Sequence, residues 1–129
     1  MTMHPAKAGT GILFRRSDLP GAPTVAAKSQ NITNTMRATT LEDGAAKVFT
    51  VEHVLSALFA LHIDNCLIEM DSAEPPVGDG SSKTFVDMVL EGGIEEQEET
   101  IRSSRSITAS LSMRAIRNSS RRSPMMAFV

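Results

Sequence analysis

TVEHVLSALFAL, residues 50–61, is the most regular apolar segment of this 129-residue chain. Its valines and leucines recur at the three- and four-residue spacing of one helical face, at Val51, Val54, Leu55, Leu58 and Leu61. Thr50 precedes the run and is a residue type that commonly caps a helix N-terminus. The spacing predicts a helix packed against a core, with Leu55 and Leu58 buried.

The first turn of this helix carries Glu52 and His53 side by side. A carboxylate is stabilised there by the unpaired backbone N–H groups and the helix dipole, so Glu52 alone says little about function. A lone histidine beside an apolar face is more often a hydrogen-bonded structural residue than a ligand. The functional alternative is that a neutral imidazole binds Zn²⁺ while the adjacent carboxylate takes a proton from water. The residues by themselves leave both readings open.

A catalytic zinc site needs further ligands, and the other candidates do not converge on His53. Catalytic zinc usually has three protein ligands and an open position. In a continuing helix His62 would lie on the opposite side, roughly 13 Å away. His4 falls in an N-terminal segment with no predicted anchor, and Cys66 lies in the apolar run NCLIEM, which predicts a buried thiol. Neither HExxH nor CxxC occurs in the sequence.

The segments around the helix predict an α+β fold, a small sheet packed with two helices. Strands are expected at 11–16, near 24–27, within 31–41 (as a strand, or a strand and turn) and at 65–70, with 42–47 as a connection. Residues 71–80 are rich in Pro and Gly and predict a loop. Ser81 or Ser82 is expected to cap a second helix that stops at 91–93. Arg15 and Arg16 end the first strand and are expected to be solvated.

Charge divides the chain into two parts. Residues 1–99 hold seven Lys and Arg against 15 Asp and Glu (7 − 15 = −8), whereas residues 100–129 hold six arginines and no acid (+6). This predicts one domain over 1–100 and a disordered Arg/Ser-rich tail over 101–129. The longest run without charges or strong breakers, 54–63, is too short for a transmembrane helix, and no secretory signal is recognised, so a cytoplasmic protein is expected.

Five stretches together resemble one known family. They are AGTGILFRRSDLPG, NTMRATTL, TVEHVLSAL, IDNCLIEMDSAEPPVGDGSSKTFV and EGGI, in this order over roughly residues 8–97. They resemble the N-terminal domain of the UDP-3-O-acyl-N-acetylglucosamine deacetylases, zinc enzymes of lipid A biosynthesis. The resemblance implies two similar α+β domains with the active site between them. It also implies Glu52 as general base, His53 as a Zn²⁺ ligand and Met36 as a substrate-binding residue, with Asn34 in place of the family's acid.

The resemblance also implies what this chain lacks. A family segment of the form Gly-Leu-His-Ser/Thr-Gly is absent, as is the second domain with its remaining zinc ligands, lysine and histidine acid. The expected substrate is UDP-3-O-acyl-N-acetylglucosamine, no nucleic acid partner is expected, and the chain alone is expected to be inactive.

The basic tail does not follow the family pattern. Its segment PMMAFV is encoded as CCN-ATG-ATG-GCN-TTY-GTN, and in the frame one base earlier the middle reads as an Asp-Gly turn before an apolar residue. We therefore hypothesise that residues from about 101 onward are an out-of-frame translation. The functional alternative is a non-catalytic module that binds nucleic acid or an anionic surface through the six tail arginines. Only one aromatic residue, Phe128, is present there for base stacking.

Overall fold

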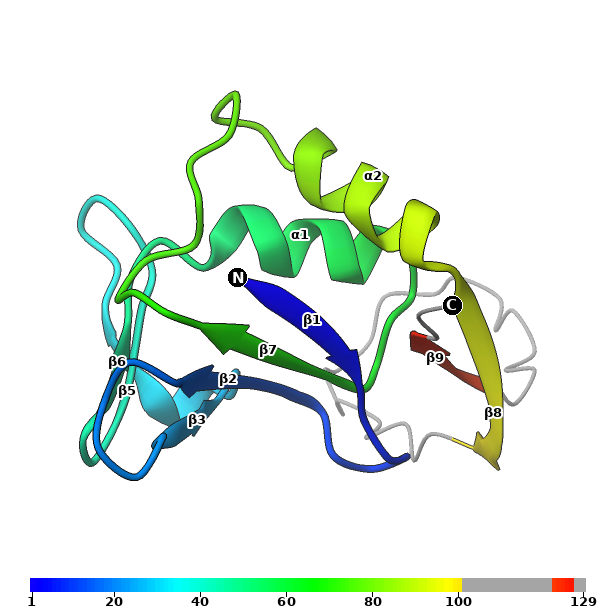
Figure 1. Ribbon diagram of the computed structural model, residues 1–129, viewed down its shortest axis with the longest axis horizontal. Helices are drawn as coiled ribbons and strands as arrows, with labels where there is room; N and C mark the ends of the chain where they lie inside the picture. Colours follow the sequence, from blue (N-terminus) through cyan, green and yellow to red (C-terminus); the bar gives the residue numbers. More distant parts are fainter. Residues whose placement is uncertain (101–121, 127–129) are drawn as a thin grey trace, which may run out of the picture.

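The computed structural model describes residues 1–100 and 122–126, which form three sheets and two helices (Figure 1). The largest sheet has the strand order β1-β7-β2-β3, the second β4-β5-β6, and the third pairs β8 with β9. The strands are β1 (Thr2–Pro5), β2 (Ile12–Arg16), β3 (Thr24–Ala26), β4 (Ile32–Asn34), β5 (Thr40–Asp43), β6 (Ala46–Val48), β7 (Cys66–Met70), β8 (Ile94–Thr100) and β9 (Arg122–Met126). The helices are α1 (Glu52–Ala60) and α2 (Lys83–Gly92), with a 3-10 turn η1 at Ser29–Asn31.

The core lies between the largest sheet and the helices, which cover one face of it (Figure 1). β7 runs parallel to β2 and antiparallel to β1, so their alternate side chains point to the same face. Phe14 and Ile68 from the sheet are buried together with Leu58 of α1 and Phe85 of α2. The core-packed helix predicted from the apolar spacing of 50–61 is therefore confirmed on the side of α1 that faces the sheet.

Most of the expected elements are confirmed, and so is the α+β class. Strands occur at each expected place, the 31–41 segment being a strand and turn, and residues 71–82 contain neither helix nor strand. α2 follows Ser82 and ends before Gly93, although the Ser82 side chain makes no capping hydrogen bond. Cys66 is buried in the middle strands of the sheet, as expected.

The N-terminal segment was expected to be unanchored, and this is wrong. His4 lies in β1, where it pairs with Leu67 of β7. Met3 is buried in the core, and the Met1 amino group lies 3.7 Å from an Asp71 carboxylate oxygen. A four-residue strand with one inward side chain carries too little periodicity to be recognised from sequence.

Three expectations for α1 and for the segment before it also need correction. The N-cap is Val51 rather than Thr50, which adopts a left-handed φ of 54°. A left-handed residue cannot provide the extended backbone that a capping threonine needs. Leu55 is only partly buried, whereas Val54 and Leu58 fill the core. The 42–47 segment is not a simple connection, because β5 and β6 occupy most of it and pair across a tight turn at Gly44.

Arg16 is buried rather than solvated. It is 8% exposed, and its guanidinium donates hydrogen bonds to both carboxylate oxygens of Asp18, at 2.8 and 2.7 Å. A third bond, of 2.6 Å, goes to the backbone carbonyl oxygen of Lys47 in β6. Arg16 therefore links the four-stranded sheet to the three-stranded one, and the ion pair lowers the pKa of Asp18.

The expected boundary at residue 100 falls at the end of β8, a strand that the sequence pattern did not predict. Residues 122–126 form β9, which is antiparallel to β8. The rest of the expected disordered tail lies outside the described residues, so that expectation stays a prediction. Within the described part, neither helix is long and apolar enough to cross a membrane.

Candidate functional site

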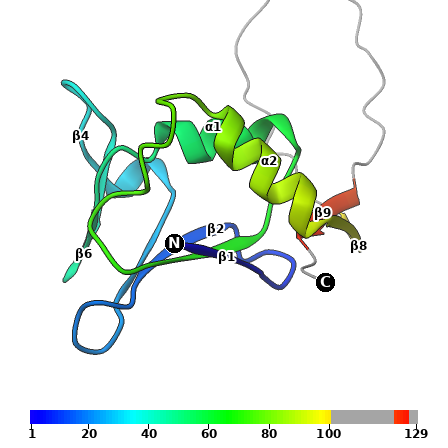
Figure 2. The same ribbon diagram turned by 45° about the horizontal axis from the view of Figure 1, so that its top comes forward.

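The candidate site is at the start of α1, where the helix meets the loop of residues 35–39 between β4 and β5. Both views place this loop and the three-stranded sheet at the end of the molecule where α1 begins, away from β8 and β9 (Figures 1 and 2). The Glu52 carboxylate accepts a 3.0 Å hydrogen bond from the Thr39 backbone N–H. The Thr39 carbonyl accepts a 3.4 Å bond from the Val51 N–H. The backbone of one loop residue thus bonds to both Glu52 and the helix N-cap.

Glu52 borders an open pocket on the outer side of α1. The pocket is lined by Thr39, Glu52, Leu55, Ser56 and Phe59. Positions 52, 55, 56 and 59 follow the spacing of one helical face, which is not the face that enters the core. Phe59 is 82% exposed on this side. One carboxylate oxygen of Glu52 accepts the hydrogen bond from Thr39, and no residue in the described part of the chain donates to the other oxygen.

Met36 lies on the other side of the same loop. It is 91% exposed and lines a second pocket together with Asn34, Arg37, Ala38, Thr40, Phe49, Thr50 and Glu74. The Asn34 side-chain oxygen accepts a 2.9 Å hydrogen bond from the Met36 N–H. This bond closes a short turn of a kind that asparagine side chains often form. The loop therefore contributes to both pockets, Thr39 to that of Glu52 and its neighbours to that of Met36.

His53 is half-buried next to Glu52 and lines neither of these two pockets. Neighbouring side chains on a helix point about 100° apart, so Glu52 and His53 face different directions. His62, at the far end, has a left-handed φ of 59° and is exposed, which agrees with its expected separation from His53. Nowhere in the described part do three His, Cys, Asp or Glu side chains gather closely enough to hold a metal ion. The described residues therefore do not form a zinc site by themselves.

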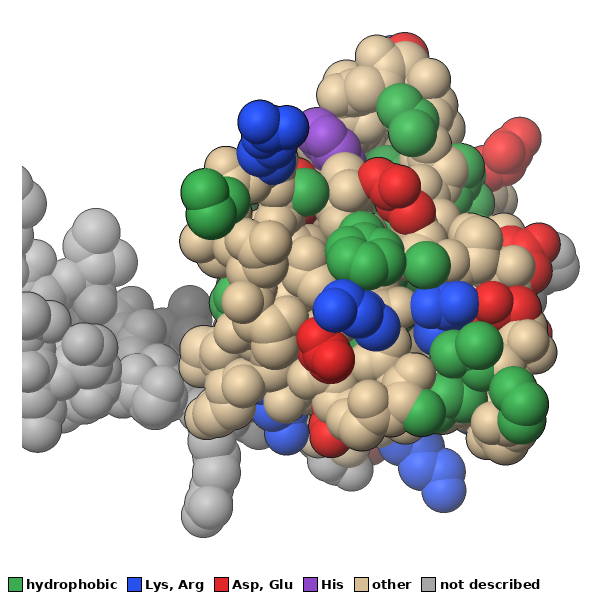
Figure 3. Space-filling view, turned by 90° about the vertical axis from the view of Figure 1, so that its left-hand side faces the viewer, with side chains coloured by type: hydrophobic (Ala, Val, Ile, Leu, Met, Phe, Trp, Pro, Cys, Tyr) green, Lys and Arg blue, Asp and Glu red, His purple; other side chains and the backbone are tan. Residues whose placement is uncertain are grey.

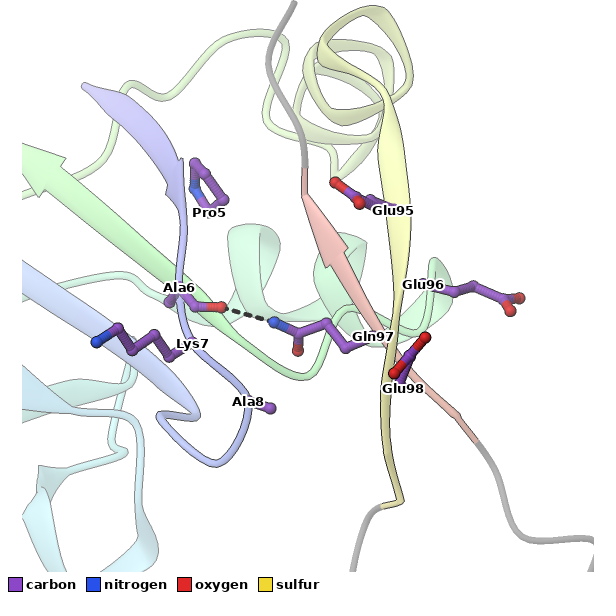
Figure 4. A pocket seen from close by; sticks show the side chains of 8 residues that line it. All are labelled: Pro5, Ala6, Lys7, Ala8, Glu95, Glu96, Gln97 and Glu98. Carbon is purple, nitrogen blue, oxygen red and sulfur yellow. Dashed lines mark hydrogen bonds between the residues drawn. The ribbon is translucent and has the colours of Figure 1, made fainter.

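The pocket between the 5–8 segment and β8 is larger and differs in character (Figure 4). The Gln97 side chain points toward this segment and donates a 3.0 Å hydrogen bond to the Ala6 carbonyl, whereas Glu96 points away from it. Gln97 also accepts a 2.8 Å bond from the Asn65 amide, and Asn65 in turn accepts one of 2.9 Å from the Gly11 N–H. These bonds tie β8 to the main sheet, which is a structural role.

Charges of both signs are interspersed at the end of the molecule that carries β5 and β6. Hydrophobic side chains there occur in separate patches between acidic and basic ones (Figure 3). Lys47, for example, pairs with Glu42 at 3.0 Å and lies over the Phe49 ring. This face does not favour the alternative of an anion-binding module. Five of the six tail arginines that suggested it lie outside the described residues.

A sequence model of one protein family matches residues 1–128 of the chain. Its description is "LpxC: UDP-3-O-acyl N-acetylglycosamine deacetylase". The chain belongs to this deacetylase family. The resemblance noted in the sequence is therefore confirmed.

Individual relatives agree with the family match. The chain is 46% identical over 99 residues to the UDP-3-O-acyl-N-acetylglucosamine deacetylase of Bdellovibrio bacteriovorus, covering 77% of this chain and 33% of the relative. It is 46% identical over 98 residues to the deacetylase of Marinobacter nauticus, covering 76% and 32%. A bifunctional enzyme LpxC/FabZ of Chlorobaculum tepidum is 46% identical over 99 residues, covering 77% and 21%. The chain thus spans about a third or less of the length of these relatives.

The three residues expected from the family resemblance, Glu52, His53 and Met36, lie around one loop and one helix end. Thr39 was not foreseen, because it acts through backbone atoms that any residue other than proline would supply. Phe59 was not singled out from the sequence because it lies within an apolar run. Its position seven residues after Glu52 could have placed it on the same helical face as Glu52, since residues seven apart share one face.

Proposed function

We propose that this chain is part of a zinc-dependent enzyme that deacetylates UDP-3-O-acyl-N-acetylglucosamine, and that it supplies the general base Glu52 and one zinc ligand, His53. Membership of the deacetylase family supports the reaction. The observation that carries the assignment within this chain is the position of Glu52, whose carboxylate is held at one oxygen by Thr39 beside an open pocket.

In this proposal Glu52 accepts a proton from the water that attacks the acetamide carbonyl. Its backbone partner fixes one carboxylate oxygen, which leaves the other to take the proton. Zinc, when bound, would polarise the carbonyl and lower the pKa of water. Met36 would contact the substrate from the neighbouring pocket. A chain with one of the required ligands should bind zinc weakly, so we expect no activity from the 129 residues alone.

The test is a chimera in which this chain replaces the matching segment of the Bdellovibrio bacteriovorus deacetylase. The chimera should release acetate from UDP-3-O-acyl-N-acetylglucosamine in a zinc-dependent reaction. Glu52→Gln keeps a side-chain oxygen for the Thr39 N–H but removes the base, so kcat should fall by about 10²- to 10⁴-fold. Zinc content, measured by elemental analysis, should stay unchanged in this variant.

His53→Asn should instead lower the zinc content of the chimera. His62→Asn is the matched control, because asparagine tolerates the left-handed backbone at that position and His62 is not a proposed ligand. Full activity of the Glu52→Gln chimera would refute the assignment of Glu52 as general base. Equal zinc loss from both histidine variants would refute the assignment of His53 as a zinc ligand. Zinc-dependent acetate release by the unmodified chain would contradict the expected inactivity.

We further propose that the deacetylase domain extends to about residue 100 and that residues 101–129 are translated out of frame. The change from an acidic to a basic chain supports this boundary. The alignments to individual relatives cover 98 or 99 residues, a length that fits this boundary, whereas the match to the family model runs on to residue 128. The coding DNA tests the idea, since a shifted frame with stop codons or without a family-like continuation would refute it.

A further inference from the structure

Within the described part of the chain, the loop of residues 35–39 is hydrogen-bonded to the start of α1 through one residue, Thr39. Both of its hydrogen bonds to the helix region use the Thr39 backbone, to Glu52 at 3.0 Å and to Val51 at 3.4 Å. The other end of the loop is closed locally by Asn34 and Met36. Between these two points Met36 and Arg37 are exposed, so packing contributes little to holding them in place.

We propose that Glu52 is also a positioning residue, whose carboxylate anchors the 35–39 loop and so fixes Met36 and Arg37 at the second pocket. The bond is charge-assisted, which makes it stronger than the backbone bond to Val51 at the longer distance. Only one carboxylate oxygen accepts the bond from Thr39, so anchoring leaves the second oxygen of this pocket-lining residue without that bond.

The anchor connects two pockets that would otherwise be independent. Met36 and Arg37 line the second pocket, and Thr39, two residues after Arg37 in the same loop, donates a hydrogen bond to the carboxylate of Glu52, which lines the first pocket. The same bond therefore sets the position of the loop and the orientation of the carboxylate. The consequence for substrate binding rests on the function proposed above, whereas the anchoring itself does not.

Limited trypsin digestion of the full chain tests the anchor without zinc, substrate or activity. Trypsin cleaves after Arg and Lys, and cleavage of a folded chain reports the population of locally opened forms. Glu52→Ala removes the acceptor, so cleavage after Arg37 should become about fivefold to tenfold faster. Glu52→Gln retains an acceptor oxygen and should restore the cleavage rate to within about twofold of the unchanged chain.

Two controls separate local loosening from general instability. Cleavage after Lys28, an exposed residue in another loop, should be the same in all variants. Ser56→Ala, in the same pocket as Glu52 but without a bond to the loop, should leave cleavage after Arg37 unchanged. The anchor is refuted if Glu52→Ala does not accelerate cleavage after Arg37, if it accelerates cleavage after Lys28 equally, or if Glu52→Gln behaves like Glu52→Ala.

The anchoring role and the proposed catalytic role can fail separately. Protection of Arg37 in Glu52→Gln together with full activity of the corresponding chimera would leave the anchor standing and remove the general base. Unchanged protection in Glu52→Ala together with an inactive Glu52→Gln chimera would do the reverse.

Discussion

The two faces of α1 make different kinds of interaction. Its inner face places Val54, Ala57 and Leu58 in a core shared with the sheet and α2. Its outer face carries an exposed Phe59 and Glu52, whose carboxylate accepts a hydrogen bond from one loop residue, Thr39. The comparison teaches that one short helix can support the fold through burial and carry a site through a few polar contacts.

The largest expected effect is a difference in the free energy of unfolding between substitutions at two neighbouring residues, one on each face of α1. Leu58 is 1% exposed and Phe59 is 82% exposed. Leu58→Ala should lower the free energy of unfolding by about 2–5 kcal/mol, because it removes buried methyl groups and leaves a cavity. Phe59→Ala should change it by less than about 0.5 kcal/mol. Urea denaturation followed by circular dichroism measures both values. A large loss with Phe59→Ala would mean that the outer face is also part of the core.

A smaller expected effect is a change in stability when the left-handed backbone at Thr50, just before α1, is relieved. Thr50 has a φ of 54°, a conformation that costs a residue with a side chain about 1–2 kcal/mol. Thr50→Gly should relieve this cost, and the added freedom of the unfolded chain should offset about 0.5–1 kcal/mol of it. We expect a net gain of about 0.5–1 kcal/mol in the free energy of unfolding. Thr24→Gly, in a regular strand, is the matched control and should destabilise the protein. Destabilisation by Thr50→Gly would show that the threonine side chain is needed there.

The smallest expected effect is a pH dependence from the Arg16–Asp18 pair. Arg16 lowers the pKa of Asp18 in the folded protein from its ordinary value of 3.8, so the unfolded chain binds the proton more readily. The pair therefore stabilises the fold above about pH 3.8, and this contribution is lost as the pH falls through the folded-state pKa. The stability difference between the unchanged chain and Asp18→Asn should be present at pH 7 and shrink toward pH 3. A constant difference would contradict this.

Sequence patterns predicted the parts of the fold that have a clear period. The apolar spacing at 50–61 identified α1, and the run NCLIEM identified β7. β1 escaped because its four residues show too little alternation, and Arg16 was misjudged because its burial depends on Asp18 and on a carbonyl from another sheet. Long-range polar partners of this kind leave no periodic signal along the chain.

The candidate site was predictable in part for the same reason. Family resemblance pointed to Glu52, His53 and Met36, and the family itself is confirmed, while the roles of these residues stay predictions. The bond between Thr39 and Glu52 joins residues 13 positions apart through a backbone group. Backbone donors are present at nearly every residue, so no residue type at position 39 could have marked it.

The buried thiol of Cys66 can serve as a built-in probe of the opening of the main sheet. Cys66 is the one cysteine of the chain, it is fully buried in the central strand β7, and burial raises its pKa to about 11. Because the thiolate is the reactive form, a thiol reagent can label Cys66 only when β7 becomes accessible. The labelling rate therefore measures how often the sheet opens, at one atom and without an introduced probe.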